Sequence, residues 1–510
     1  MARNGNIILA RGIGMDKEHK NIINYSSSSM LQLLRSQNHF VSEKTDYSFI
    51  SENGKGGNVI ATNFTYQECK NANYIAFQNP TYYNKWIFAF IDSVEYANDG
   101  CTKITFTVDN WSTWFDNLTF KSCFVVREHV NSDNIGEHTV PEGLETGEYI
   151  INSHGSDSQN TNLTCVCATT LSPGELVNFY GGVYNGIPSG ITYYRFDTIT
   201  GGEGSNSLQE YLSTLTGDRI NAVQSIFLAP TWLVGGSSGS INIPTSNIPQ
   251  SFAMSIPKLY TLDTYTPKNK KMLTYPYVYI NMSNGQGGNA IYHQELWEDT
   301  NDLMTFNVQG CLTPGCSIRG VPYKYKGENN PYDEGLNLGK FPQISWTTDQ
   351  YTNWLTQNGV NMNIDTVASI LSAPKTGGLS LAVGISKTMN EVYQHSLLPP
   401  QAKGNINSGD VVTASGNNKF HYYRMSIKRE FAKIIDDYFT RFGYKVNSLK
   451  VPNITGRTYW NYVEIGDGED IAFGTLPVDA MEDINNIFRR GTTIWHNHDN
   501  IGNFGLDNTL

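Results

Sequence analysis

The chain has 510 residues and a formal net charge of −11, and only 16% of its residues are charged, against about a quarter in an average globular protein. Affinity for nucleic-acid backbones comes chiefly from clustered lysine and arginine, so this charge argues against a general nucleic-acid binder. The 47 glycines, 30 tyrosines and 23 phenylalanines favour strands and turns, and we expect a mostly β protein of roughly three domains.

The N-terminus and the cysteines suggest a chain that is not secreted by the classical route. The apolar run before Arg11 is too short for the hydrophobic region of a signal peptide. An odd number of cysteines without such a signal predicts reduced, buried thiols and no disulfide framework. These are Cys69, Cys101, Cys123, Cys165, Cys167, Cys311 and Cys316.

The first 160 residues predict a capped helix followed by strands. Serines at 27–29 precede the apolar residues of a short helix. The run at 86–91 is continuously apolar, as in a strand covered on both faces, whereas residues 103–108 alternate between apolar and polar. We predict strands at 58–62, 74–78, 86–96, 103–108 and 120–128. So many strands in so short a stretch indicate a barrel or a sandwich.

The middle of the chain reads as a second β-rich region. Residues 129–160 are polar with several glycines, which places a boundary near residue 160. We then expect strands at 163–169, 271–280, 305–312 and 316–325 and a helix at 207–215. Asp349 is expected to cap a short helix that ends at Gly359.

Two helices and two strands are predicted near the C-terminus. Apolar residues recur at helical spacing up to Gly443, which supplies the stop: Ile427, Phe431, Ile434, Ile435, Tyr438 and Phe442. Strands are expected at 446–451 and 459–463. A second helix starts near Pro477 and ends before Gly491.

Several short motifs that could carry chemistry have simpler explanations. Residues 235–239 spell G-x-S-x-G, but the sequence that follows cannot form the helix that a nucleophile elbow needs. His496, His498 and Asp499 could share a metal ion, although a surface turn explains so short a motif more simply. The cysteine pairs lack the spacing of a structural zinc site, and no Gly-Lys-Ser/Thr phosphate loop is present.

Acidic pairs could suggest the two carboxylates of a glycoside hydrolase, but a sequence does not give the separation that this chemistry requires. Asp436 and Asp437 are more simply the solvated face of the C-terminal helix, and Asp467, Glu469 and Asp470 form the other acidic group. We therefore predict no catalytic residue, no metal ligand and no cofactor.

The most unusual stretch is an apolar loop at residues 361–417. Its middle, Val367 to Ser386, carries a single charge, and Pro374 with the glycines at 377–378 interrupts any one helix. A buried helical hairpin is the common explanation of such runs. Here the central proline and glycines, the missing polar face and the polar flanks argue against it, so the loop must be hidden in an assembly or released into an apolar medium. The residues expected to make this contact are Val367, Ala368, Ile370, Leu371, Ala373, Leu379, Leu381, Ala382, Val383 and Ile385.

Seven blocks of sequence stand out along the chain, at residues 74–91, 106–115, 124–130, 273–280, 341–358, 436–453 and 491–496. In their sequence and in their order, these blocks resemble the tail knob proteins of short-tailed phages that infect Gram-positive bacteria. The resemblance implies a structural protein at the distal end of the virion tail, a hexameric tube built from β-barrel domains similar to those of tail-tube and baseplate-hub proteins. It also implies that six apolar loops plug the lumen and emerge during genome ejection to help breach the host membrane.

The resemblance divides the chain into a first tube β-barrel domain (1–160), an inserted β-rich domain (161–270), and a second tube domain with C-terminal helices (271–360 and 418–510). The apolar loop at 361–417 is inserted in that second domain. The implied partners are five further copies of the chain, the collar and connector proteins of the tail, the host membrane, and viral DNA that passes without sequence-specific contact. The alternative is a tail protein that binds or cleaves host-surface glycans.

Overall fold

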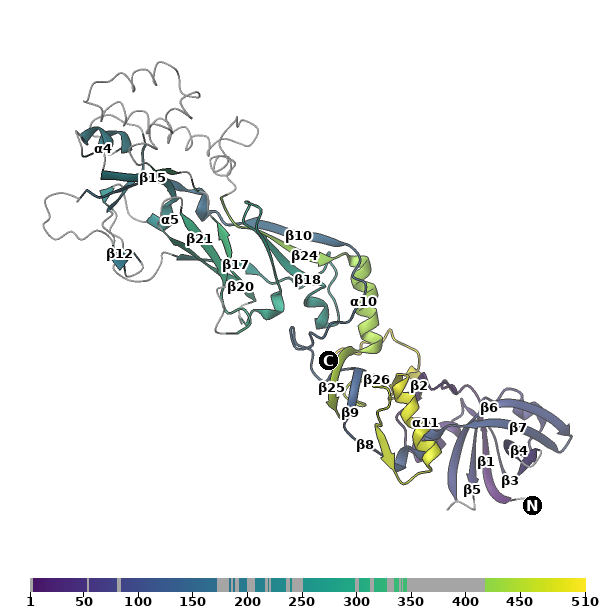
Figure 1. Ribbon diagram of the computed structural model, residues 1–510. Coiled ribbons are helices and arrows are strands. Elements are labelled where there is room, and N and C mark those ends of the chain that lie inside the picture. Colours follow the sequence, from purple (N-terminus) through teal and green to yellow (C-terminus); the bar gives the residue numbers. More distant parts are fainter. Residues whose placement is uncertain are drawn as a thin grey trace. The chain divides into compact units, whose positions relative to one another are not determined.

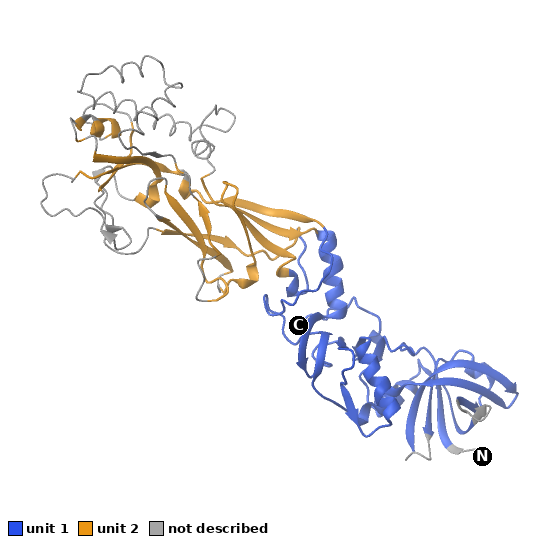
Figure 2. Cartoon of the chain, viewed as in Figure 1, with its two compact units in different colours: residues 1–147, 264–272, 429–510 blue, residues 148–263, 273–428 orange. Residues whose placement is uncertain are grey.

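The chain is described from a computed structural model (Figure 1), which covers residues 3–52, 55–79, 84–171, 183–184, 187–188, 192–199, 207–215, 219, 222–234, 239–240, 251–298, 302–311, 316–327, 334–338, 341, 343–345 and 418–510. The chain forms two compact units, which are coloured separately in Figure 2. The first unit takes residues 1–147, 264–272 and 429–510, and the second takes residues 148–263 and 273–428. Each unit is therefore assembled from segments that are distant in sequence.

Six antiparallel strands at the start of the first unit close into a barrel (Figure 1). They are β1 (Arg3–Ala10), β3 (Phe40–Glu52), β4 (Lys55–Thr62), β5 (Tyr74–Asn79), β6 (Lys85–Asn98) and β7 (Cys101–Val108). The order is β1-β3-β4-β7-β6-β5, and β1 closes the barrel because it pairs with both β3 and β5. The sequence did not decide between a barrel and a sandwich, and it did not predict strands β1 and β3.

Strand β6 is covered on both faces, as its continuous apolar run predicts. Ala89 belongs to the core inside the barrel, to which strands all around the barrel contribute. Phe88 and Phe90 belong to a second core outside the barrel, together with Met30 and Leu34. Those two residues lie on helix α1 (Ser27–Leu34), which was predicted, although its N-cap is Ser26 and the serines at 27–29 lie within the helix. A second short helix, α2 (Tyr66–Cys69), follows β4.

The remainder of the first unit is a five-stranded sheet with helices against it. Its order is β2-β28-β26-β9-β25, and a pair β8-β27 lies apart from it. The strands are β2 (Asn21–Ile23), β8 (Leu118–Phe120), β9 (Cys123–Glu128), β25 (Tyr444–Lys450), β26 (Trp460–Ile465), β27 (Ala472–Gly474) and β28 (Thr492–Trp495). The helical elements are α3 (Asn110–Trp114), η1 (Phe115–Asn117), η4 (Lys270–Leu273), α10 (Arg429–Phe442), α11 (Val478–Arg489) and η9 (His498–Asn500).

The described residues of the second unit form three larger sheets and a short hairpin. Their orders are β16-β14-β11-β15-β23, β17-β20-β21-β22 and β10-β24-β18-β19, with the hairpin β12-β13. The first of these sheets comprises β16 (Gly239–Ser240), β14 (Thr192–Phe196), β11 (Leu163–Thr169), β15 (Val223–Pro230) and β23 (Gln343–Ser345). The second comprises β17 (Ser251–Pro257), β20 (Leu303–Cys311), β21 (Ser317–Pro322) and β22 (Leu336–Leu338).

The third sheet comprises β10 (Tyr149–Ser156), β24 (His421–Ile427), β18 (Val278–Ser283) and β19 (Asn289–Tyr292), and the hairpin comprises β12 (Val183–Tyr184) and β13 (Ile187–Pro188). The helical elements among the described residues of this unit are η2 (Gln159–Thr161), α4 (Leu208–Thr214), α5 (Thr231–Val234) and η5 (Gln294–Leu296). One core joins side chains from the three sheets, and α4 covers a separate smaller core beside β11.

The mostly β fold is confirmed, and so are several individual elements. Helix α4 follows the cap at Ser207, and α10 and α11 end where glycine was predicted to stop them. Gly443 and Gly491 adopt φ angles of +64° and +78°, which an L-residue tolerates poorly. The cysteine side chains that the structure describes are free thiols, as predicted.

Two strand predictions need correction. Residues 271–280 do not form one strand, since η4 covers the start of this range and β18 begins at Val278. The reason is Pro276, which has no N–H to donate and so cannot lie within a central strand. Residues 120–128 hold the end of β8 and all of β9 rather than a single strand. The short helix predicted after Asp349 lies outside the described residues.

Candidate functional site

The predicted membrane-active residues belong to the apolar loop, and the whole of residues 346–417 lies outside the part of the chain that the structure describes. The assignment of Val367, Leu381 and the rest of that set therefore stays a prediction. The G-x-S-x-G motif also falls outside, except for Gly239 at the start of β16. None of the helices in the described ranges is both long enough and apolar enough to cross a membrane.

Two of the acidic residues considered for a catalytic pair, Asp436 and Asp470, make structural contacts. Asp436 is buried on α10, and its carboxylate accepts hydrogen bonds from the Tyr265 hydroxyl (2.7 Å) and the backbone N–H of Lys268 (2.8 Å). The prediction that Asp436 lies on a solvated face is wrong, because these donors cover it. Asp470 pairs with Arg489 at 2.7 Å. The buried and multiply bonded carboxylate of Asp436 suits a structural role better than acid–base catalysis.

A buried ion network ties distant segments of the first unit together. The carboxylate of Glu142 lies between the cationic groups of Arg127 and Lys271, and it accepts the backbone N–H of Lys445 at 2.9 Å. Arg127 also donates to the carbonyl of Gly443 at 2.8 Å. Burial lowers the pKa of Lys271, and the hydrogen bond and charge of Glu142 oppose that change. Because these charges satisfy one another, the network stabilises the unit and leaves little to offer a ligand.

A cleft of about 530 Å³ in the first unit lies beside a second buried pair. His19 Nε2 lies 3.2 Å from Asp109 Oδ1, and the Tyr74 hydroxyl donates to Asp109 Oδ2 at 2.7 Å. Burial alone raises the pKa of Asp109, but the hydrogen bonds from His19 and Tyr74 outweigh it, and the pKa is lowered. The charged side chains that line the cleft are Lys17, Arg489, Arg490, Asp467 and Asp483. With both signs present, the cleft has no clear preference for an anion or a cation.

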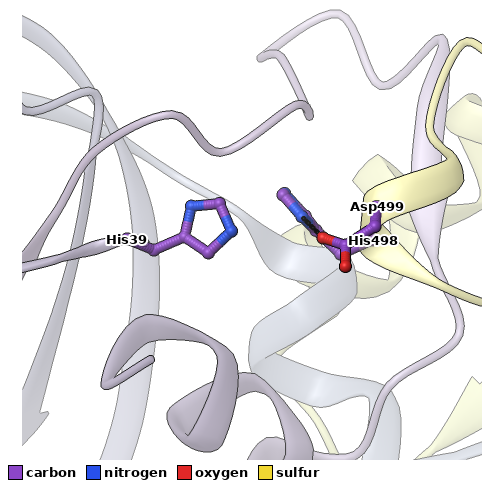
Figure 3. Close-up of side chains that lie close together, drawn as sticks. All are labelled: His39, His498 and Asp499. Carbon is purple, nitrogen blue, oxygen red and sulfur yellow. Dashed lines mark ion pairs between the residues drawn. The ribbon is translucent and has the colours of Figure 1, made fainter. Parts of the chain in front are cut away.

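Two histidines and an aspartate meet in the first unit (Figure 3). One potential ligand atom from each of His39, His498 and Asp499 lies within 4.8 Å of the others. The imidazole rings of His39 and His498 are 4.6 Å apart between centroids and nearly perpendicular, at 79°. Nδ1 of His498 is 3.6 Å from Oδ1 of Asp499. The side chain of His498 is only 7% exposed, whereas that of Asp499 is 77% exposed, so the cluster has a buried floor and an open rim.

Backbone contacts orient both rings of this cluster. Nδ1 of His39 lies 3.0 Å from the carbonyl oxygen of Arg11, which can only accept, so Nδ1 carries the proton. The neutral ring then has a lone pair on Nε2. Nε2 of His498 accepts the backbone N–H of Gly14 at 3.2 Å, which places the proton of that ring on Nδ1. Burial lowers the pKa of His498, so the neutral form is favoured.

The sequence analysis identified two members of this cluster and missed the third. His496, which was considered with His498 and Asp499, is turned away and bonds through Nε2 to Asn461 Oδ1 at 2.9 Å. His39 precedes β3 and takes its place. No local pattern could have found it, since a histidine so far away in the chain gives no spacing signal. The expected surface turn is a 3₁₀ turn whose aspartate is exposed and whose histidine is buried.

Comparison with known proteins gives matches over most of the chain. Residues 244–509 match the family model described as the C-terminal domain of the tail knob protein gp9 of Bacillus phage phi29. Residues 3–119, which include the barrel, match a model described as the N-terminus of the caudoviral major tail protein.

Curated relatives and a solved structure agree with these matches. The tail knob protein gp9 of Bacillus phage PZA is 24% identical, and the alignment covers 86% of this chain and 88% of the relative. The protein of the same name from Bacillus phage B103 is also 24% identical, with 88% and 90% covered. The fold is similar to that of the tail knob protein gp12 of bacteriophage C1, with a TM-score of 0.63, 14% identity and 98% of both chains covered.

Proposed function

This chain belongs to the family of tail knob proteins of short-tailed phages that infect Gram-positive bacteria, and on that premise we propose that it builds a closed tube at the distal end of the virion tail. The observation that carries the proposal is the family match over residues 244–509 together with a fold likeness that covers almost the whole chain. The relatives are named tail knob proteins, and this name supports a structural role in the tail for this chain over an enzymatic one.

The proposed assembly is a ring of six copies that contacts the collar and connector proteins above it and lets DNA pass through its lumen. The barrel at the N-terminus supports this, because it matches a major tail protein model and a closed barrel is a rigid building block without free sheet edges. The net charge of −11 is compatible with a channel that DNA passes without adhering to it.

The apolar loop at residues 361–417 is proposed to plug the lumen before ejection. Each copy of the stretch from Val367 to Ser386 carries one charge and is interrupted by proline and glycine, so one copy alone cannot span a bilayer as a helix. Six copies buried against one another would keep their apolar side chains from water. When they are displaced, lipid can replace these neighbours, and the loops then help to penetrate the host membrane.

Deleting residues 366–386 tests the role of the loop. We expect the variant to assemble like the wild-type chain but to lose the dye leakage that the released wild-type form causes in liposomes. The matched control replaces Asn405 and Asn407 with aspartate, which adds charge to the polar flank of the loop and should leave leakage intact. Equal leakage with and without residues 366–386 would refute the membrane role.

One surface observation favours the alternative of glycan binding. On the second unit, Tyr275 is 45% exposed, and its ring stacks on His293 with 4.1 Å between centroids and 7° between planes. Tyr279 lies 6.2 Å from Tyr275, and Tyr149 lies 5.4 Å from Tyr279. Exposed aromatic faces of this kind are suited to stacking on sugar rings. This function would be favoured if the chain binds a soluble cell-wall saccharide saturably and the substitution Tyr275→Ala abolishes that binding.

A further inference from the structure

We propose that His39, His498 and Asp499 form a binding site for a divalent transition-metal ion, with Zn²⁺ as the best match. The set consists of two imidazoles and one carboxylate, donors that suit zinc, nickel or cobalt better than calcium or magnesium, which prefer oxygen ligands throughout. The site is independent of the tube function and lies entirely within the first unit.

His39 is prepared to act as a ligand. The hydrogen bond from its Nδ1 to the Arg11 carbonyl fixes both the ring orientation and the tautomer, so that the lone pair lies on Nε2. Histidine ligands in metalloproteins are commonly held by a hydrogen bond of this kind. Figure 3 shows the ring of His39 turned toward His498 and Asp499.

His498 supplies the second donor from the floor of the site. Its Nδ1 is buried and makes no hydrogen bond of normal length to the described residues, and Oδ1 of Asp499 lies 3.6 Å away. A buried polar nitrogen left in this way has a cost that a bound ion would remove. Nδ1 faces the carboxylate of Asp499, which is exposed and can rotate toward an ion.

The geometry requires a modest contraction on binding. Ligand atoms around a tetrahedral Zn²⁺ lie about 3.3 Å apart, given bonds of about 2.0 Å, whereas the present separations extend up to 4.8 Å. Nδ1 of His498 and Oδ1 of Asp499 are already 3.6 Å apart, so most of the contraction lies in the distances to His39. Solvent at the open rim can supply water as the fourth ligand, as in sites with three protein ligands.

Metal binding at Nδ1 also has a chemical consequence at Gly14. The neutral ring of His498 now carries its proton on Nδ1, because Nε2 accepts the Gly14 N–H. An ion on Nδ1 requires this proton to move, through solvent, to Nε2. Nε2 then ceases to be an acceptor, and the Gly14 amide loses its bond and exchanges faster. We therefore expect a bound ion to stabilise the first unit against unfolding and, at the same time, to make the Gly14 amide exchange its hydrogen faster.

Titration of the chelator-treated full chain with Zn²⁺ tests the site, and Co²⁺ gives an absorption spectrum that reports the coordination. We expect one ion per chain, a higher Tm with Zn²⁺, and faster hydrogen exchange in a peptide that contains Gly14. His39→Ala and Asp499→Asn should each weaken binding at least about tenfold. Asp499 is exposed, so its variant should fold even if the other does not.

His138→Ala is the matched control, because the ring of His138 also donates to a backbone carbonyl, that of Ser132, but lies outside the cluster. It should bind Zn²⁺ like the wild-type chain. The inference fails if the folded chain shows no saturable binding up to millimolar Zn²⁺. It also fails if Asp499→Asn binds as tightly as the wild-type chain, or if His138→Ala weakens binding as much as the cluster variants do.

Discussion

His129 shows how a single buried side chain makes the first unit sensitive to acid. Its Nδ1 accepts the backbone N–H of Tyr462 at 2.7 Å, and its Nε2 donates to the carbonyl of Thr440 at 3.1 Å. Burial, with the nearby charge of Arg457, lowers the pKa of His129 from 6.5 to about 3. Protonation would add a positive charge at a buried position close to Arg457 and would remove the bond from Tyr462. The neutral ring is therefore a condition of the native fold.

We predict that the first unit loses stability as the pH falls from 6.5 toward 3. In this window the unfolded chain binds a proton at His129 that the folded chain does not, so the free energy of unfolding decreases with decreasing pH. His129→Gln removes the titrating group and should flatten this dependence, although it lowers stability at neutral pH. Urea unfolding at pH 7 and pH 5 measures the difference. An unchanged pH dependence in the variant would show that other groups control acid sensitivity.

The sequence could identify the residues of a site only where these residues are close together in the chain. The sequence placed His498 and Asp499 together because they are adjacent, but His39 reaches them through the folding of the barrel. Asp436 was expected in solvent because an acidic residue on a helix usually is. Its burial depends on donors from residues 265–269, which no helical pattern reveals. Tertiary contacts therefore decide which polar side chains remain exposed to solvent or to a ligand.

Among the secondary-structure elements, the sequence predicted best those helices whose ends and apolar faces are set by nearby residues. Helices α1, α4, α10 and α11 were predicted from caps, apolar spacing and stop glycines. The buried face of α10 was predicted less well. Ile434 is 69% exposed, whereas Ala432 and Phe439 are buried. The apolar spacing alone did not show which side of the helix the rest of the unit would cover.

Gly443 is predicted to be the most sensitive of the stop glycines. It has a φ of +64°, and a Cβ there would lie 2.1 Å from the backbone oxygen of Glu128, so Gly443→Ala adds a clash to the backbone strain. Gly468→Ala is the control, because φ is +78° but nothing lies within 4 Å of the added atom. The control should cost about 1–2 kcal/mol, and Gly443→Ala clearly more, as measured by thermal unfolding. Equal losses would mean that the backbone near Glu128 moves aside.

At the scale of the whole molecule, the fold class and the family could be predicted from the sequence, because ordered blocks of sequence span most of the chain. The structure divides the chain into two compact units, and the domain boundaries expected at residues 160, 270 and 360 stay a prediction, since one unit can hold more than one domain. No local sequence pattern predicts that residues 264–272 and 429–510 belong to the first unit. Their place in it rests on long-range contacts such as those of Glu142 and Asp436.

The most direct test of the tube is single-particle imaging of the purified full chain beside the variant that lacks residues 366–386. We expect six-fold rings for both proteins, with density on the ring axis in the full chain and an open axis in the variant. Rings with the same axial density in both would contradict the plug. A full chain that stays monomeric at every concentration would contradict self-assembly into a tube, and glycan binding would then be the preferred function.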